Sequence, residues 1–236
     1  MLEATFELYG RYPVLFLILA TAVIVPYDLI AFAVTGVAPL SRSDVSLGAM
    51  LFFDLTNWAL VTPLVSALHV HAVSDVRLDR EPRIGPVARR GLKVLPVVAA
   101  ATIAATLGML IGFLLLIIPG IILFLRWAVV AQAAAIEHEG WLTALRRSGR
   151  LSRGNYGHIA AFLILTGAIA SAPSWGGTVL FGTDNGSAIT IIVGVALRVV
   201  TASFAALASA LLYFDLVARS EVELATEPTV ASESEA

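Results

Sequence analysis

The chain has 236 residues, of which 58% are hydrophobic and 14% are charged, whereas roughly 25% of the residues of an average soluble domain are charged. With a mean hydropathy of +0.89, this composition indicates an integral membrane protein and argues against a soluble globular domain. The net charge of −2 excludes little, but the lack of cysteine excludes disulfides, thiolate metal sites and cysteine nucleophiles.

The first dozen residues are rich in aromatic side chains and suit a short segment at the membrane interface. The apolar run that follows continues to about Val34, and Glu3 and Glu7 outweigh Arg11 before it. A retained transmembrane helix is therefore expected, rather than a cleaved signal peptide.

Six stretches come near the length and apolarity needed to cross a bilayer, which takes about 20 residues of helix. They are residues 13–36, 47–73, 94–118, 121–136, 156–172 and 188–218. Only Pro119-Gly120 separates the third from the fourth, and because this pair is a strong turn signal, a tight helical hairpin is predicted there. The expected fold is an all-α polytopic membrane domain over residues 1–220, with six transmembrane helices and short interfacial helices.

The basic residues predict the orientation. With a cytoplasmic N-terminus, the far side carries only Arg42, and the cytoplasmic side carries Arg11, Arg77, Arg80, Arg83, Arg89, Arg90, Lys93, Arg146, Arg147, Arg150, Arg153 and Arg219. This is the positive-inside pattern, so both termini are expected in the cytoplasm. The preference for arginine over lysine and the abundance of alanine indicate a GC-rich prokaryotic genome, hence a bacterial inner membrane.

The segment 140–153 predicts a short amphipathic helix between the fourth and fifth spans. Arg146, Arg150 and Arg153 follow one face, while the tryptophan and the leucines of the segment lie largely on another. Two interpretations remain open. The helix lies in the interface with these arginines and Arg147 toward anionic headgroups, or the segment is an ordinary basic loop that sets the topology.

A series of short motifs runs from the third span to the C-terminus. They are a Pro-Gly pair, an Arg-Trp pair, a glutamate near a helix end, an Ala-Leu-Arg-Arg-Ser segment and an Arg-Gly pair, here Pro119, Gly120, Arg126, Trp127, Glu137, Ala144 to Ser148 and Arg153 with Gly154. The C-terminal "LLYFDLVARSE", which contains Asp215 and Arg219, adds an aromatic-Asp-Leu pattern. Together these motifs resemble the bacterial membrane-domain family of glycerophosphoryl diester phosphodiesterases.

The resemblance covers the chain well from about Leu114 onward and earlier only by topology. The sequence departs from it at Gln132, where the family often has proline, so the shape of the fourth helix is an open question. The resemblance implies a six-helix unit that stands alone, without the catalytic barrel from which the family takes its name. No phosphodiesterase activity is therefore expected.

Four charged residues interrupt the apolar spans: Asp28, Asp54, Arg126 and Arg198. Counting about 1.5 Å per residue from the span ends predicts that they share a layer between the midplane and the outer face. Charges at that depth are costly unless they are paired or hydrated. Either they form Asp–Arg pairs that lock helices together, or they line a polar cavity for an anion, a headgroup or a coupling proton. The equal number of acids and bases favours the first hypothesis.

The remaining titratable residues are expected to be interfacial. Asp215 falls at the cytoplasmic end of the sixth span, where Arg219 can pair with it at i+4. His69 and His71 lie on different helix faces, and the consecutive residues Glu137, His138 and Glu139 diverge in direction, so no metal site is predicted. Glu137 is expected to pair with an arginine of the following segment. The acidic tail, residues 221–236, is expected to be disordered.

No nucleophile elbow, phosphate loop or zinc-helix motif is present, and the arginine clusters lack the interleaved aromatic residues of nucleic-acid-binding proteins. The expected function is that of a non-enzymatic membrane anchor, scaffold or accessory subunit without a cofactor, either in a homo-oligomer or with an unknown protein partner. The alternative is a small-solute or ion transporter or channel that uses the layer of Asp28, Asp54, Arg126 and Arg198.

Overall fold

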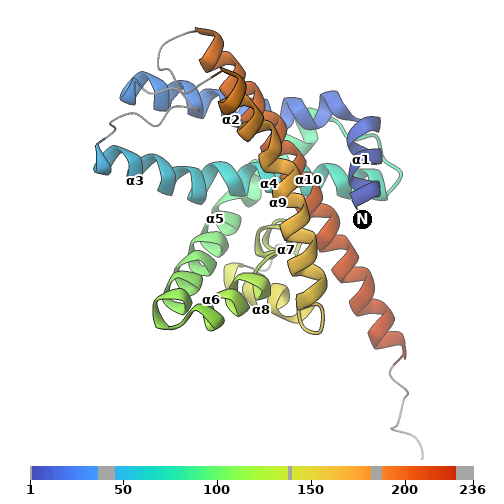
Figure 1. Cartoon of the computed structure of the whole chain (residues 1–236). Coiled ribbons are helices and arrows are strands. Elements are labelled where there is room, and N and C mark those ends of the chain that lie inside the picture. The colour runs from blue at the N-terminus through green and yellow to red at the C-terminus, as the bar shows by residue number, and fades with distance from the viewer. Residues whose placement is uncertain (1, 37–45, 138–139, 182–187, 227–236) are drawn as a thin grey trace, which may run out of the picture.

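The computed structural model describes residues 2–36, 46–137, 140–181 and 188–226, and every element in these ranges is helical. Six helical segments of this part are long and apolar enough to cross a membrane. The prediction of an all-α fold with six spans is therefore confirmed. Consecutive spans run antiparallel and form three hairpins (Figure 1).

The first hairpin consists of α2 (Pro13–Thr35) and a second span made of α3 (Leu47–Thr56), the π-helical turn η1 (Asn57–Val61) and α4 (Thr62–Arg77). The sequence analysis did not predict the π-helical turn. Its physical cause is Pro63, because proline has no N–H with which to continue the α-helical ladder. The N–H of Thr62 donates instead to the carbonyl of Asn57, five residues earlier. The second span is thus one helix that is locally widened in its middle.

The second hairpin begins with α5 (Ile84–Leu115), which starts ten residues before the predicted span. The extra turns are anchored to α4, since Arg90 donates a 3.0 Å hydrogen bond to the carboxylate of Asp75. Val87 is fully buried. The basic segment between the second and third spans is therefore largely helical.

The turn of this hairpin lies at Leu116, so the prediction that placed it at Pro119-Gly120 was wrong. Leu116 is extended (φ −162°, ψ 149°) and separates α5 from α6 (Ile117–Arg126). Pro119 and Gly120 lie in the first turn of α6, where proline is tolerated because the first N–H groups of a helix lack intrahelical partners. Gly120 permits close packing, because a Cβ there would lie 2.4 Å from the ring of Phe113.

The fourth span is broken, although the sequence analysis treated residues 121–136 as continuous. α6 ends at Arg126, and α7 (Val130–Glu137) begins after a turn over residues 127–129. The carbonyl of Arg126 accepts hydrogen bonds from the hydroxyls of Ser148 at 3.1 Å and Ser152 at 3.2 Å. These two hydroxyls replace the N–H donor that a continuous helix would supply.

Both serines belong to the region of α8 (Trp141–Leu151), which confirms the predicted amphipathic helix. Arg146 and Arg150 are exposed, whereas Ala144 and Leu151 are buried against the rest of the fold. Figure 1 shows α8 beside α6 at the lower edge of the molecule. The helix is therefore packed on the second hairpin through its apolar and serine face.

The third hairpin consists of α9 (Tyr156–Phe181) and α10 (Ala188–Thr226), which both extend beyond the predicted spans. α10 continues six residues into the segment that was expected to be disordered, while residues 227–236 lie outside the described part. The short α1 (Leu2–Arg11) packs on α10, with the ring centroids of Phe6 and Phe204 5.2 Å apart. The core contains residues of α2, α4, α5, α7, α9 and α10.

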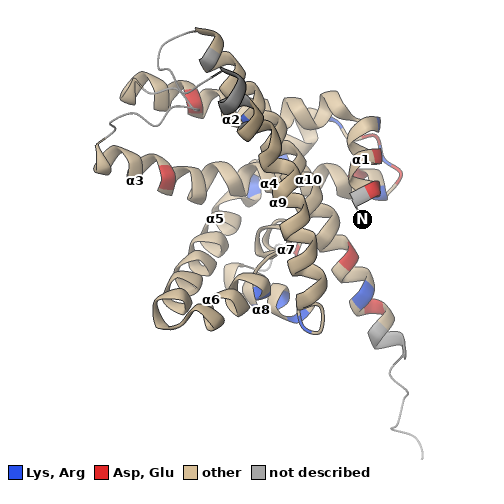
Figure 2. Ribbon diagram, in the orientation of Figure 1, with Lys and Arg blue, Asp and Glu red and all other residues tan. Residues whose placement is uncertain are grey.

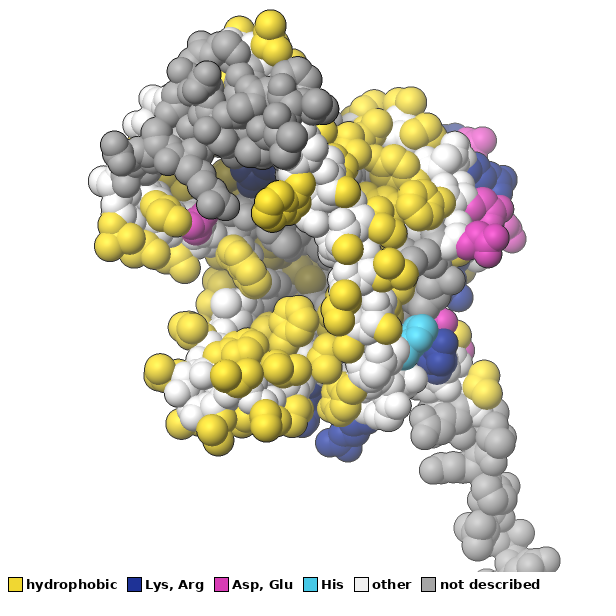
Figure 3. Space-filling view, viewed as in Figure 1, with side chains coloured by type: hydrophobic (Ala, Val, Ile, Leu, Met, Phe, Trp, Pro, Cys, Tyr) yellow, Lys and Arg dark blue, Asp and Glu magenta, His cyan; other side chains and the backbone are white. Residues whose placement is uncertain are grey.

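The surface of the described part is apolar over the hairpins and charged along α8 and near the N-terminus. Large side chains near the tip of the second hairpin are exposed, such as Leu114 at 85%, which suits contact with lipid. Basic residues lie along α8, and residues of both charges lie near the ends of other helices on the side of the N-terminus (Figure 2). The space-filling view shows a hollow between the first and second hairpins (Figure 3).

Candidate ligand site between the spans

A cavity of about 370 Å³ lies between the helices, and all six spans contribute to its wall. Most of the wall is apolar, with residues such as Ile24, Met109, Phe124, Leu163 and Ala202. The size falls within the range of small-molecule pockets, which are mostly apolar with a few polar groups that orient the ligand. The cavity is therefore the best-formed candidate site in the part of the chain that the structure describes.

Both irregular points of the spans line this cavity. The π-helical turn contributes Asn57, Trp58 and Val61, and the broken fourth span contributes Trp127 and Ala128. Irregular backbone at membrane depth is tolerated only where it is buried in protein or lines a cavity. Single π-helical turns also occur frequently at functional sites. The two interruptions, far apart in sequence, thus meet at one place.

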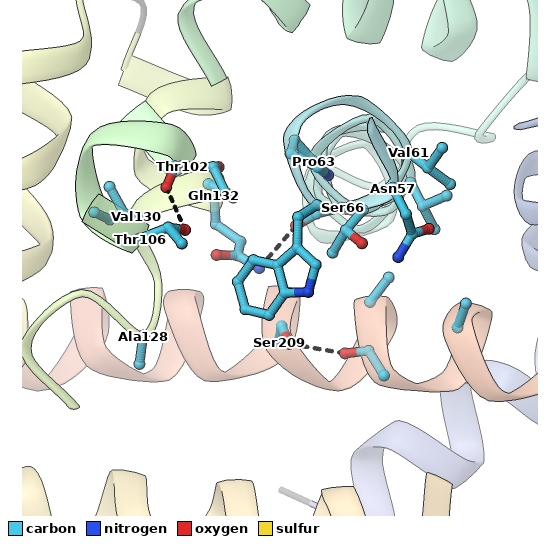
Figure 4. A pocket seen from close by; sticks show the side chains of 18 of the residues that line it. Asn57, Val61, Pro63, Ser66, Thr102, Thr106, Ala128, Val130, Gln132 and Ser209 are labelled. Carbon is cyan, nitrogen blue, oxygen red and sulfur yellow. Dashed lines mark hydrogen bonds between the residues drawn. The ribbon is translucent and has the colours of Figure 1, made fainter. Parts of the chain in front are cut away.

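Gln132 of α7 and Ser66 of α4 lie next to each other in the cavity wall (Figure 4). The Gln132 amide nitrogen donates a 2.9 Å hydrogen bond to the Ser66 hydroxyl. Gln132 is 97% buried, and its Oε1 atom has no hydrogen-bond partner within the described residues. An unsatisfied buried acceptor costs about 1–3 kcal/mol, so a ligand that donates to Oε1 would regain this energy.

Three hydroxyl side chains of the cavity wall donate within their own helices. Thr102, Thr106 and Ser209 each donate a 2.8 Å hydrogen bond to a carbonyl four residues earlier. Their oxygens are still free to accept a further bond. These oxygens and Oε1 of Gln132 are acceptors for a molecule inside the cavity, and the indole N–H groups of Trp58 and Trp127 are donors in the same wall.

A buried ion pair borders the cavity where Arg198 lines it. Arg198 in α10 forms an ion pair with Asp28 in α2 and donates a 2.6 Å hydrogen bond to the side-chain oxygen of Asn57. Its guanidinium also lies 5.3 Å from the ring centroid of Tyr27, whose hydroxyl donates to the carbonyl of Phe53. These contacts connect α2, α10 and the second span, as the pairing hypothesis predicts.

The four charges of the predicted layer do not come together. Asp28 and Arg198 are paired, but Asp54 is exposed on α3, and its carboxylate forms no hydrogen bond or ion pair with any residue that the structure describes. Arg126 lies at the end of α6 and lines a separate hollow beside α8 with Arg146 and Arg150. The predicted layer is therefore one pair and two separate charges.

Several residues of the sequence motifs have structural roles near α8. Glu137 accepts hydrogen bonds from Arg147 at 2.7 Å and from Tyr213 at 3.1 Å, so the prediction that Glu137 pairs with a following arginine is confirmed. Trp127 lies in the break of the fourth span. Gly154 has a φ of 77° after α8, a left-handed conformation that favours glycine.

The C-terminal motif also has the predicted pair. Arg219 donates to Asp215 at 2.6 Å across one helical turn, which confirms that prediction. His158, which the sequence analysis did not single out, lies 3.4 Å from the same carboxylate and joins α9 to α10. Arg153 is exposed at the edge of the hollow beside α8.

The histidines of α4 are part of the packing. His69 is fully buried, with its ring nitrogens 2.8 Å from the Val65 carbonyl and 3.1 Å from the Ser203 hydroxyl. Among the described residues, no group of three or more His, Asp or Glu side chains is arranged to hold a metal ion. His138 and Glu139 lie outside these residues.

The sequence analysis missed Asn57 and Ser66, and it treated Gln132 only as a departure from a family pattern. One available signal was the occurrence of an amide side chain in the middle of an otherwise apolar span. Comparison of the chain with models of protein families, with curated proteins and with solved structures finds no match.

Proposed function

We propose that this protein is a non-enzymatic membrane carrier that binds a small amphipathic molecule in the cavity between its six spans. One observation carries the proposal: the π-helical turn at Asn57–Val61 and the break at 127–129 line the same cavity as the unpartnered Oε1 of Gln132. Interrupted helices that meet near the middle of a bundle are a known design of transporter binding sites.

The wall of the cavity indicates the class of ligand. Its apolar majority suits a ligand whose bulk is apolar, and the acceptor Oε1 of Gln132 calls for a hydroxyl or N–H group on that ligand. The one charged residue of the wall, Arg198, is paired with Asp28. Because this pair has no excess charge, the proposed ligand is uncharged.

An anchor, scaffold or accessory subunit, the first hypothesis from the sequence, needs no such cavity. The proposed site also differs from the transporter hypothesis in its position. The ion pair Asp28–Arg198 is assigned to holding α2 against α10, and the ligand is assigned to the space beside it. The side chains of Asp54 and Arg126 have no part in this site.

The proposed location is a bacterial inner membrane, with both termini in the cytoplasm. The basic residues along α8 support this orientation. Membership of the membrane-domain family of glycerophosphoryl diester phosphodiesterases stays a prediction. The absence of cysteine makes the orientation simple to measure, because a single introduced cysteine is the only thiol in the protein.

Because the sequence has no cysteine, single introduced cysteines also allow a direct test of the cavity. Thr106→Cys places a thiol in the cavity wall, and Leu107→Cys places one on the exposed face of α5 next to it in the chain. Both positions lie at nearly the same depth. A water-soluble methanethiosulfonate reagent reacts with a thiolate, which requires water. A carrier's cavity is reached by water from one side of the membrane, so only the first variant should react in sealed vesicles.

Addition of the reagent to right-side-out and to inverted vesicles identifies the open side. Reaction at Thr106→Cys from either side, with no reaction at Leu107→Cys, supports the proposal. Equal lack of reaction at both positions, with both variants folded by thermal unfolding in detergent, contradicts it, because a carrier site that water never reaches cannot take up a solute.

A further inference from the structure

Four arginines line one hollow beside α8, which shares no lining residue with the cavity. They are Arg126, Arg146, Arg150 and Arg153, and Thr143 lines the hollow with them. Arg146 and Arg150 lie one turn apart on the exposed face of α8, and Arg153 follows in the turn after the helix. Figure 2 shows basic residues along this helix and in the turn after it. Arg126 reaches the same hollow from the end of α6.

The positive charge of this cluster is not balanced within the described part of the chain, where none of the four guanidinium groups forms an ion pair. Glu137, at the end of α7, forms an ion pair with Arg147 at 2.7 Å and accepts a hydrogen bond from the hydroxyl of Tyr213. Arg147 is therefore not one of the converging charges. Like charges gathered around one hollow repel one another, and a bound anion would relieve that repulsion.

α8 holds Arg126 in this position at two points. Ser148 and Ser152 donate hydrogen bonds to its carbonyl, which fixes the end of α6. Gly149 leaves room for its side chain, because a Cβ at this position would lie 2.8 Å from Nε of Arg126. The arginine most distant in sequence is thus placed beside the other three by specific contacts.

We propose that Arg126, Arg146, Arg150 and Arg153 bind a phosphate group. Guanidinium groups donate pairs of hydrogen bonds in a fixed plane, which matches the oxygens of a phosphate. α8 also exposes Trp141 at 42% and Leu142 at 51%, as a helix in a membrane interface does. A phospholipid headgroup and a soluble phosphate share the required chemistry, and the experiment distinguishes between them.

The test uses Gly149→Ala, which keeps all four charges but places a methyl group 2.8 Å from Nε of Arg126, so that this side chain must shift. The matched control is Gly157→Ala, because a Cβ at Gly157 meets no atom within 4 Å. Arg126→Gln removes one guanidinium, and Arg89→Gln removes an exposed arginine outside the cluster. Each protein is purified in detergent and titrated with phosphatidylglycerol, with phosphatidylcholine as the reference lipid, and bound lipid is measured by native mass spectrometry.

We expect the unchanged protein and both controls to bind phosphatidylglycerol in preference to phosphatidylcholine. Arg126→Gln should weaken that binding about tenfold or more, since a charge-assisted hydrogen bond contributes about 1.5–3 kcal/mol. Gly149→Ala should weaken it as well, although no charge has changed. Arg150→Gln, at an exposed position, serves as the second variant if Gly149→Ala does not fold.

Competition with inorganic phosphate then identifies the source. Displacement of the lipid by phosphate shows a site open to soluble anions, and persistence of the lipid shows a headgroup site; both results support the four-arginine site. Equal lipid binding by the unchanged protein, by Arg126→Gln and by the folded variant of Gly149 or Arg150 would overturn it, because the affinity would then come from general surface charge.

Discussion

The amide nitrogen of Gln132 donates a 2.9 Å hydrogen bond to the hydroxyl of Ser66, while the amide oxygen of the same side chain faces the cavity without a partner. A buried amide with one satisfied end is costly in an empty protein. It is useful in a binding site, because the fixed nitrogen orients the oxygen toward a ligand. Gln132 lies in the fourth span just after its break and is bonded to the second span, and this position connects the fold to the proposed function.

Replacing Gln132 by leucine distinguishes the effect of the amide on stability from its role in ligand binding. Gln132→Leu removes the unpaired acceptor and fills a similar volume, so the unfolding temperature of the ligand-free protein in detergent should stay the same or rise. Binding of the cavity ligand should be lost, because its donor has no acceptor. Ser66→Ala leaves Oε1 in place but removes the partner of the amide nitrogen, so it should weaken ligand binding without abolishing it. A large fall in the unfolding temperature of Gln132→Leu would show that the amide is structural.

The ion pair between Asp28 and Arg198 should act as a lock. Asp28 is 3% exposed, but the Arg198 side chain is 32% exposed, so removing one partner should cost less than the roughly 3–5 kcal/mol typical of a fully buried pair. Asp28→Asn and Arg198→Gln should each lower the yield of folded protein and its unfolding temperature. The double variant should recover part of the loss.

Asp54→Asn is the matched control for this lock, because Asp54 is exposed and its carboxylate forms no bond with a described residue. Its effect on the unfolding temperature should be small. Equal losses for Asp28→Asn and Asp54→Asn would contradict the assignment of the lock to Asp28, and additive losses in the double variant would show that Asp28 and Arg198 do not interact.

The sequence allowed the prediction of local pairs but not of distant ones. Asp215 and Arg219 are four residues apart on one helix, so helix geometry alone predicts their bond. Asp28 and Arg198 are 170 residues apart, and Arg126 was an equally plausible partner until the packing of α10 beside α2 was known. Counting residues gives the depth of a charge along a straight helix, but it does not tell which helices are neighbours.

The break in the fourth span could not be predicted from the sequence for a similar reason. Nothing in residues 127–129 is a strong helix breaker, and the donors that satisfy the carbonyl of Arg126 are 22 and 26 residues away. The turn at Leu116 was misplaced because Pro119-Gly120 is a turn signal in most contexts. Here the proline sits in the first turn of a helix, and the glycine is used for packing.

The two serines that hold the break should contribute to stability together. Ser148→Ala or Ser152→Ala alone should lower the free energy of unfolding by about 1 kcal/mol, a typical net hydrogen-bond contribution. The double variant should lose more than the sum, because the carbonyl of Arg126 then has no hydroxyl donor. Ser171→Ala, whose hydroxyl only bonds within α9, is the control. An additive double variant would show that the two bonds are independent of each other.

Gly120 should be intolerant of a side chain. Gly120→Ala would place a methyl group against the ring of Phe113, and overpacking of this kind typically costs about 1–3 kcal/mol. Phe113→Leu should relieve the loss in the double variant. Gly167→Ala is the control, since a Cβ there meets no atom within 4 Å and should be stabilising by roughly 1 kcal/mol through helix propensity. Equal effects of the two alanines would contradict the close packing of α5 on α6.

The most direct test of the central claim is a comparison of two phenylalanine variants of α10. Ala205→Phe fills the cavity, and Ala196→Phe places the same ring on the exposed face of the same helix. Small molecules that copurify with each protein from its native membrane are extracted and compared by mass spectrometry. We expect an uncharged amphipathic molecule with the unchanged protein and with Ala196→Phe, and its loss from folded Ala205→Phe. Identical small-molecule profiles for all three proteins would contradict the claim that the cavity is a binding site.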